Sequence, residues 1–99
     1  MIENAYQKDV TADIALGDVD FEANRKAGKA GYNFLPHSFI ICPSADDADE
    51  WKTIVYEPFS GVGVITAILR CGVVHQIPVK KIFNSGTVGN TIIVLGMSD

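Results

Sequence analysis

The chain has 99 residues, which is the size of one domain, and this length excludes an enzyme built from several domains. Eleven isoleucines and ten valines stand against four leucines, and this excess of β-branched side chains favours sheet over helix. Twelve acidic residues exceed eight basic ones, for a net charge of −4, so we expect no surface for nucleic acid or an anionic membrane.

The first third of the chain differs in composition from the rest. Residues 1–38 hold six of the nine alanines but only four of the 21 isoleucines and valines. Residues 22–27 could start a short helix, but Gly28 and Gly31 follow at once and oppose a stable helix there. We predict that residues 1–36 form an extended N-terminal arm for assembly, separate from a β-domain over residues 37–99. The apolar residues of this arm are candidates for an assembly interface: Val10, Ile14, Leu16, Phe21, Tyr32 and Phe34.

From Phe39 onwards, short apolar runs alternate with turn residues. Strands are predicted at residues 39–42, 53–56, 62–69, 73–83 and 91–95, with one helical turn over residues 44–51. Pro78 interrupts the fourth strand, because proline donates no ladder hydrogen bond and favours an edge or a kink. Five or so short strands with frequent turns predict an all-β fold, a small antiparallel β-sandwich or barrel.

Residues 62–69 are apolar on both sides of the predicted strand. Val64 belongs to one side and Ile65 to the other, because successive side chains alternate. One face of a strand in a two-layer sandwich meets water, so the second apolar face needs a cover. A neighbouring subunit or the arm is the obvious cover. We therefore expect a homo-oligomer, a closed trimer or pentamer, and add Val64 and Ile65 to the candidate interface.

Four residues supply the ligand types of a zinc site: His37, Cys42, Cys71 and His75. The spacing opposes that interpretation. Cys71 and His75 would lie roughly 13 Å apart along a strand, and His37 and Cys42 would face opposite sides. The acidic run over residues 46–50 lacks the spacing of a calcium loop and suits the start of a helix. We expect no bound metal.

No other motif predicts chemistry. Gly61-Val62-Gly63 is followed by a β-branched strand rather than by the helix of a phosphate-binding loop. Ser60 has no recognisable partner for nucleophilic catalysis. Lys80 and Lys81 point to opposite faces of a strand and make no basic patch. We predict no catalytic residue, no cofactor, no nucleic-acid binding and no enzyme activity.

Targeting signals are equally sparse. The first residues lack both the basic segment and the apolar core of a signal peptide. The longest apolar run, residues 62–69, is too short to cross a bilayer. Two cysteines do not make a disulfide framework. We expect synthesis in a cytoplasm with both thiols reduced, and no association with a membrane.

The sequence from residue 37 to residue 95 resembles the head spike base proteins, small virion proteins of tailed bacteriophages and phage-like gene transfer agents. The matching order begins with Cys42-Pro43-Ser44, Asp46-Asp47 and Val55-Tyr56, and continues with the runs at residues 77–82, 84–87 and 92–95. This resemblance implies a small all-β structural protein on a capsid surface, without catalysis.

The sequence therefore predicts a structural virion protein, either a vertex spike base or a head decoration (cement) protein. Its partners would be the major capsid protein or other virion proteins, and its location the capsid surface. The alternative is a small β-sandwich module that binds a carbohydrate or another ligand. Trp51, Tyr56 and Phe59 could cluster at one end of such a sandwich as a sugar platform. We favour packing roles for these three aromatic residues.

Overall fold

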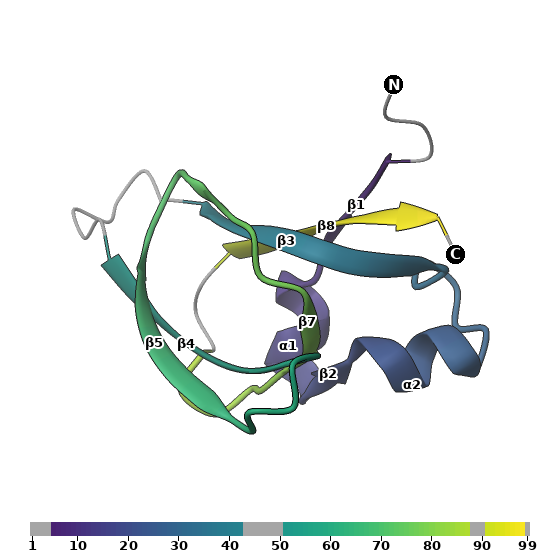
Figure 1. Ribbon diagram of the computed structural model, residues 1–99, viewed down its shortest axis with the longest axis horizontal. Helices are drawn as coiled ribbons and strands as arrows, with labels where there is room; N and C mark the ends of the chain where they lie inside the picture. The colour runs from purple at the N-terminus through teal and green to yellow at the C-terminus, as the bar shows by residue number, and fades with distance from the viewer. Residues whose placement is uncertain (1–4, 43–50, 88–90, 99) are drawn as a thin grey trace.

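In the residues that the computed structural model describes, 5–42, 51–87 and 91–98, eight strands form two antiparallel sheets that face each other (Figure 1). The first sheet has the order β1 (Ala5–Asp9), β8 (Thr91–Ser98), β3 (Phe34–Cys42), β6 (Val74–His75). The second has the order β2 (Val19–Asp20), β7 (Val79–Ile82), β4 (Trp51–Pro58), β5 (Ile65–Arg70). The predicted all-β, sandwich-like antiparallel fold is confirmed.

The core lies between the two sheets and is built by alternation along the strands. In the first sheet, Phe39 pairs with Val94 and Ile41 with Ile92, and all four side chains are fully buried. In the second sheet, Ile54 and Tyr56 of β4 point inwards. The rings of Phe39 and Tyr56 meet edge to face, 6.0 Å apart, and so join the two layers.

The predicted strand over residues 73–83 is in fact two strands in different sheets. β6 pairs with β3, whereas β7 pairs with β4. Between them, the Ile77 amide donates to the His75 carbonyl (2.9 Å), and Pro78 offers no amide to continue the ladder. Pro78 therefore marks the crossover between the layers. The predicted helical turn over residues 44–51 lies outside the described residues except for Trp51, which begins β4.

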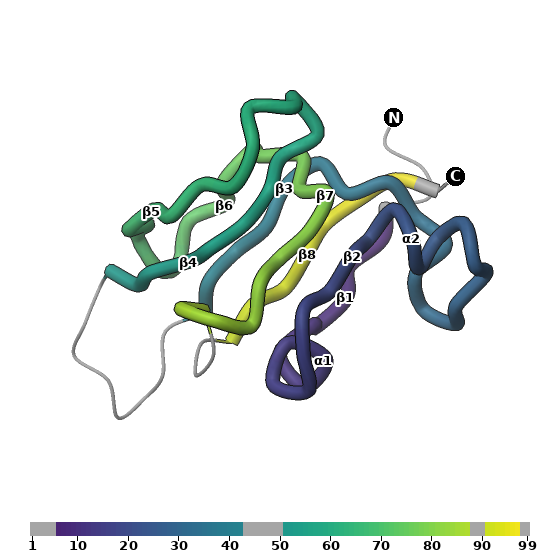
Figure 2. Tube along the Cα trace, turned by 90° about the horizontal axis from the view of Figure 1, so that it is seen from below, coloured from purple at the N-terminus to yellow at the C-terminus, as the bar shows by residue number. Residues whose placement is uncertain are grey.

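The structure differs from the predicted arm, because residues 5–36 are part of the sandwich. β1 pairs with β8, and β2 pairs with β7 (Figure 2). Two short helices belong to the same segment: α1 (Thr11–Leu16) follows β1, and α2 (Phe21–Lys26) follows β2. The radius of gyration, 12.9 Å, is close to the roughly 13 Å of a compact domain of this length. α2 forms although Gly28 and Gly31 opposed a stable helix there, because the Asp20 side chain caps its start and the helix ends before both glycines.

Hydrogen bonds fasten this segment to the far end of the chain. The Asn84 side chain donates to the Ile14 carbonyl (2.6 Å), and the Asn84 amide donates to the Asp18 carboxylate (2.8 Å). The Ile92 amide donates to the Thr11 hydroxyl (3.0 Å). Each element of this segment is short and buries only one face, so its apolar residues are sparse in the sequence. That sparse pattern is why the sequence predicted an extended arm. Each such element contributes only one or two side chains to the core.

Candidate functional site

A group of exposed apolar side chains lies on and beside the β4–β5 hairpin. Val62, Val64 and Ile68 are 68%, 59% and 67% exposed, and Trp51 is 56% exposed. Ile68 stands across from Thr53, and Trp51 across from Arg70, so these residues share the outer face of the second sheet. We call Trp51, Val62, Val64 and Ile68 the hairpin surface. Trp51 and Ile68 lie near one end of the hairpin, and Val62 and Val64 lie near its turn. Exposed apolar side chains gathered on one element are typical of protein–protein contact sites.

The other side of β5 faces the core. Ile65, Ala67 and Leu69 are partly buried and pack against the core cluster. Of the predicted pair, Ile65 therefore serves the fold, whereas Val64 is available for contact. The strand begins at Ile65, three residues later than expected, because Gly61 and Gly63 take left-handed backbone angles (φ 78° and 90°). The chain's own core covers one apolar face of β5 and leaves the other exposed.

The remaining candidate interface residues also divide into exposed and buried side chains. Leu16, at the end of α1, is 90% exposed. The other five are no more than 2% exposed and belong to the core: Val10, Ile14, Phe21, Tyr32 and Phe34. The prediction of an interface at these five is wrong for the single chain, because their partners are side chains of the same sandwich.

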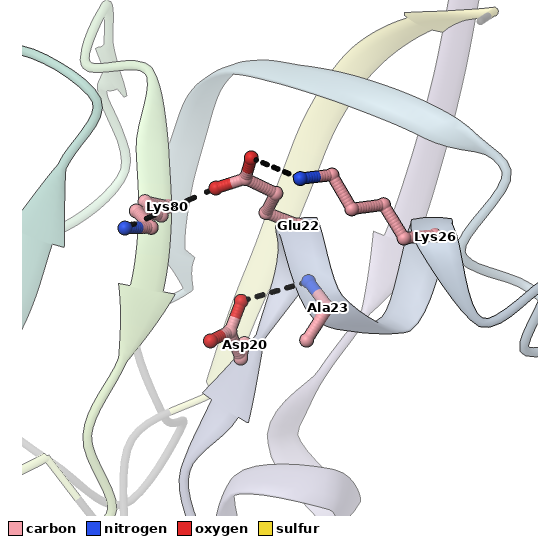
Figure 3. Close-up of a pocket in the computed structure, with 5 residues that line it drawn as sticks. All are labelled: Asp20, Glu22, Ala23, Lys26 and Lys80. Carbon is pink, nitrogen blue, oxygen red and sulfur yellow. Dashed lines mark hydrogen bonds and ion pairs between the residues drawn. The ribbon is translucent and has the colours of Figure 1, made fainter.

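A shallow, open pocket of about 290 Å³ lies beside α2 (Figure 3). Its carboxylates and ammonium groups are already engaged with the protein. The Asp20 side chain caps α2 by accepting from the Ala23 amide (2.9 Å). Glu22 lies 3.0 Å from the Lys26 Nζ and 3.9 Å from the Lys80 Nζ. The Lys26 hydrogen bond lowers the pKa of Glu22. The pocket is thus a small ion-pair network that stabilises the start of a helix.

Tyr32 is the buried polar group of the N-terminal segment. Its hydroxyl donates to the Asp13 carboxylate, and its ring packs against Phe21 and Phe34, at centroid distances of 5.9 and 6.4 Å. Burial raises the pKa of Tyr32, and the hydrogen bond to Asp13 raises it further. Two ammonium groups, those of Lys8 and Lys29, approach the same ring.

The four residues considered as zinc ligands do not form one site, and the two histidines make separate hydrogen bonds. The His37 Nδ1 is 2.9 Å from the Ser38 Oγ, and the His75 Nε2 is 2.8 Å from the Arg70 carbonyl oxygen. Cys42 and Cys71 are free and partly buried. Within residues 5–42, 51–87 and 91–98 there is no cluster of three or more metal-ligating side chains. The acidic run over residues 46–50 lies outside the described residues.

Two polar residues that the sequence pattern did not single out individually hold loops in place. Thr87 is fully buried, and its hydroxyl accepts from the Val55 amide (2.8 Å). Asn84 bonds to the segment around α1, as described above. Both belong to the run at residues 84–87 that contributes to the family resemblance. Their roles in this chain are structural.

Among the helices of the described residues, none has the length and apolar character needed to span a membrane. The sequence matches no family model, and it matches neither a curated protein nor a solved structure.

Proposed function

We propose that this chain is a structural protein of a bacteriophage or phage-like particle, a vertex spike base or a decoration protein on the head. The observation that carries the proposal is the hairpin surface. Three of its four side chains are aliphatic, and all four are more than half exposed on one hairpin of a small sandwich. Leaving such side chains in water has a free-energy cost that a permanent contact removes.

The shape of the molecule supports the same role. The hairpin surface lies on the β5 side, whereas both ends of the described chain emerge on the β1 and α2 side (Figure 1). A protein with its exposed apolar side chains on one side suits attachment of that side to a large particle. The resemblance of residues 37–95 to head spike base proteins supports a phage or phage-like particle as the proposed partner.

The proposed partners are the major capsid protein or another virion protein, and further copies of this chain. The hairpin surface lies on one side of the sandwich, so it can meet a different surface of the next copy in a head-to-tail contact. Such contacts close into rings when the rotation between copies allows it. A trimer suits a decoration protein between capsomers, and a pentamer suits a spike base at a five-fold vertex.

The carbohydrate-binding alternative loses its aromatic platform. Tyr56 is only 6% exposed and packs in the core. Trp51 is the first residue of β4 and Phe59 follows its last, so about 25 Å of strand separates these two exposed rings. Rings that far apart do not stack on one sugar. Binding on a glycan array would restore this alternative.

Immunogold microscopy of particles from the source culture tests the proposal. An antibody against this chain should label the heads, at vertices for a spike base or over the whole surface for a decoration protein. Particles from a strain without the gene are the matched control and should stay unlabelled. If the protein stays in the soluble fraction and purified particles carry no label, the proposal is wrong.

A further inference from the structure

Two lysine side chains from different parts of the chain converge on one aromatic ring. The Lys8 Nζ, from β1, lies 5.0 Å from the centroid of the Tyr32 ring. The Lys29 Nζ, from the turn after α2, lies 5.2 Å from the same centroid. The two ammonium groups are therefore at most about 10 Å apart. Each is attracted to the ring, but the two charges repel each other.

No carboxylate of the described residues forms an ion pair with either lysine. Two neighbouring carboxylates, of Asp9 and Asp13, are hydrogen-bonded to other donors. Asp13 accepts from the Tyr32 hydroxyl, and Asp9, which follows Lys8, accepts from the Thr11 amide (3.0 Å). An ammonium group has three N–H donors, and an aromatic ring satisfies none of them with a lone pair. The lysine pair thus concentrates positive charge and open donors in a chain with a net charge of −4.

Gly31 leaves room for the Lys8 ammonium group. A Cβ at this position would lie 3.0 Å from the Lys8 Nζ, and the φ of Gly31 is +85°. Gly28, in the same turn, also has a positive φ (+70°), but a Cβ there would meet nothing within 4 Å. The contact with the ammonium group is therefore particular to Gly31, whereas the backbone conformation is common to both glycines.

We propose that Lys8 and Lys29 bind the carboxylates of an acidic polypeptide segment on a partner protein. Alternate residues of an extended peptide lie about 7 Å apart on one side, which is within the upper limit of about 10 Å on the separation of the two ammonium groups. A single small anion would instead need donors that converge on one point. This site is on the β1 and α2 side of the molecule, opposite β5 (Figure 1), so it is independent of the hairpin surface and of the function proposed above.

The test is a calorimetric titration of the full chain with acetylated hexaglutamate and, separately, with inorganic phosphate. We expect hexaglutamate to bind at low ionic strength and more weakly in added salt. Lys8→Gln and Lys29→Gln should each raise its dissociation constant about threefold to fivefold. Lys81→Gln is the matched control, because the Lys81 Nζ lies alone over the Phe83 ring (4.9 Å), and it should leave binding unchanged.

A second pair of variants changes the geometry without changing the charge. A Cβ at Gly31 meets only the flexible end of Lys8, which can give by a few tenths of an ångström, so Gly31→Ala and Gly28→Ala should both leave hexaglutamate binding nearly unchanged, although both strain the backbone. Circular dichroism checks that each variant folds. The proposal is overturned if hexaglutamate does not bind, if Lys81→Gln weakens binding as much as Lys8→Gln does, or if phosphate binds the same residues more tightly than hexaglutamate.

Discussion

Val64 and Ile65 are neighbours in the chain but have opposite environments. Val64 is 59% exposed on the hairpin surface, whereas Ile65 packs against the core. We expect Ile65→Asp to lower the free energy of unfolding by about 3 kcal/mol, because it places a charge against apolar side chains. Val64→Asp should change it by less than about 0.5 kcal/mol. Urea denaturation followed by circular dichroism measures both.

The same two variants separate folding from assembly. Val64→Asp should give a folded protein that no longer binds particles, because the charge must lose its water in the contact. Ile65→Asp should neither fold nor bind particles. If Val64→Asp unfolds the protein as readily as Ile65→Asp, or if it binds particles like the wild type, the hairpin surface is not the contact site.

Tyr32 makes stability depend on alkaline pH. Its pKa is raised in the folded protein, first by burial and then by the hydrogen bond to Asp13, so folding favours the neutral phenol. The contribution is complete below the unfolded pKa of about 10 and is lost progressively as the pH rises above it. The wild type should therefore lose stability relative to Tyr32→Phe between pH 9 and about pH 12. Thermal melts of both proteins across this range measure the difference, and parallel curves would contradict the prediction.

At the scale of elements, the N-terminal segment is needed for folding. Of the fourteen buried apolar side chains in the described residues, six come from this segment: Val10, Ile14, Val19, Phe21, Tyr32 and Phe34. Burying each contributes about 2 kcal/mol, which together rivals the entire stability of a typical domain, about 5–15 kcal/mol. Deletion of residues 1–36 should leave an unfolded chain with no cooperative melting transition. A truncated protein that melts cooperatively as a monomer would restore the independent arm.

A milder change tests one element at a time. The Asp20 side chain caps α2, so Asp20→Ala should lower stability by about 1 kcal/mol. Asp20→Asn keeps an oxygen acceptor for the Ala23 amide and should cost less. Thermal melts compare the two variants with the wild type. Equal losses for both would assign the effect to the charge of Asp20 rather than to its hydrogen bond.

At the scale of the whole molecule, we expect the protein to form a closed ring of three or five copies. The hairpin surface remains exposed in the single chain, and a head-to-tail contact would cover it in every copy. Native mass spectrometry should show one dominant oligomer that Val64→Asp converts to monomer. Monomer at every concentration would contradict the ring and leave the capsid as the partner that covers this surface.

The sequence by itself determined the fold class and the chemistry of the strands. The excess of isoleucine and valine, with turn residues at short intervals, predicted an all-β sandwich, and period-two alternation predicted opposite environments for Val64 and Ile65, although Val64 lies just before β5. These features are readable because strand formation and side-chain direction depend on neighbouring residues.

Only the tertiary structure decided where the N-terminal segment belongs and which apolar face is free. Short elements such as β2 and α1 carry one or two buried residues each, so their sequences lack the periodicity that indicates a core element. β2 pairs with β7 and α1 contacts β8, in each case with partner residues more than 60 positions away along the chain. Pairing over that distance depends on the shape of the assembled sheets, and so does the convergence of Lys8 and Lys29 on Tyr32.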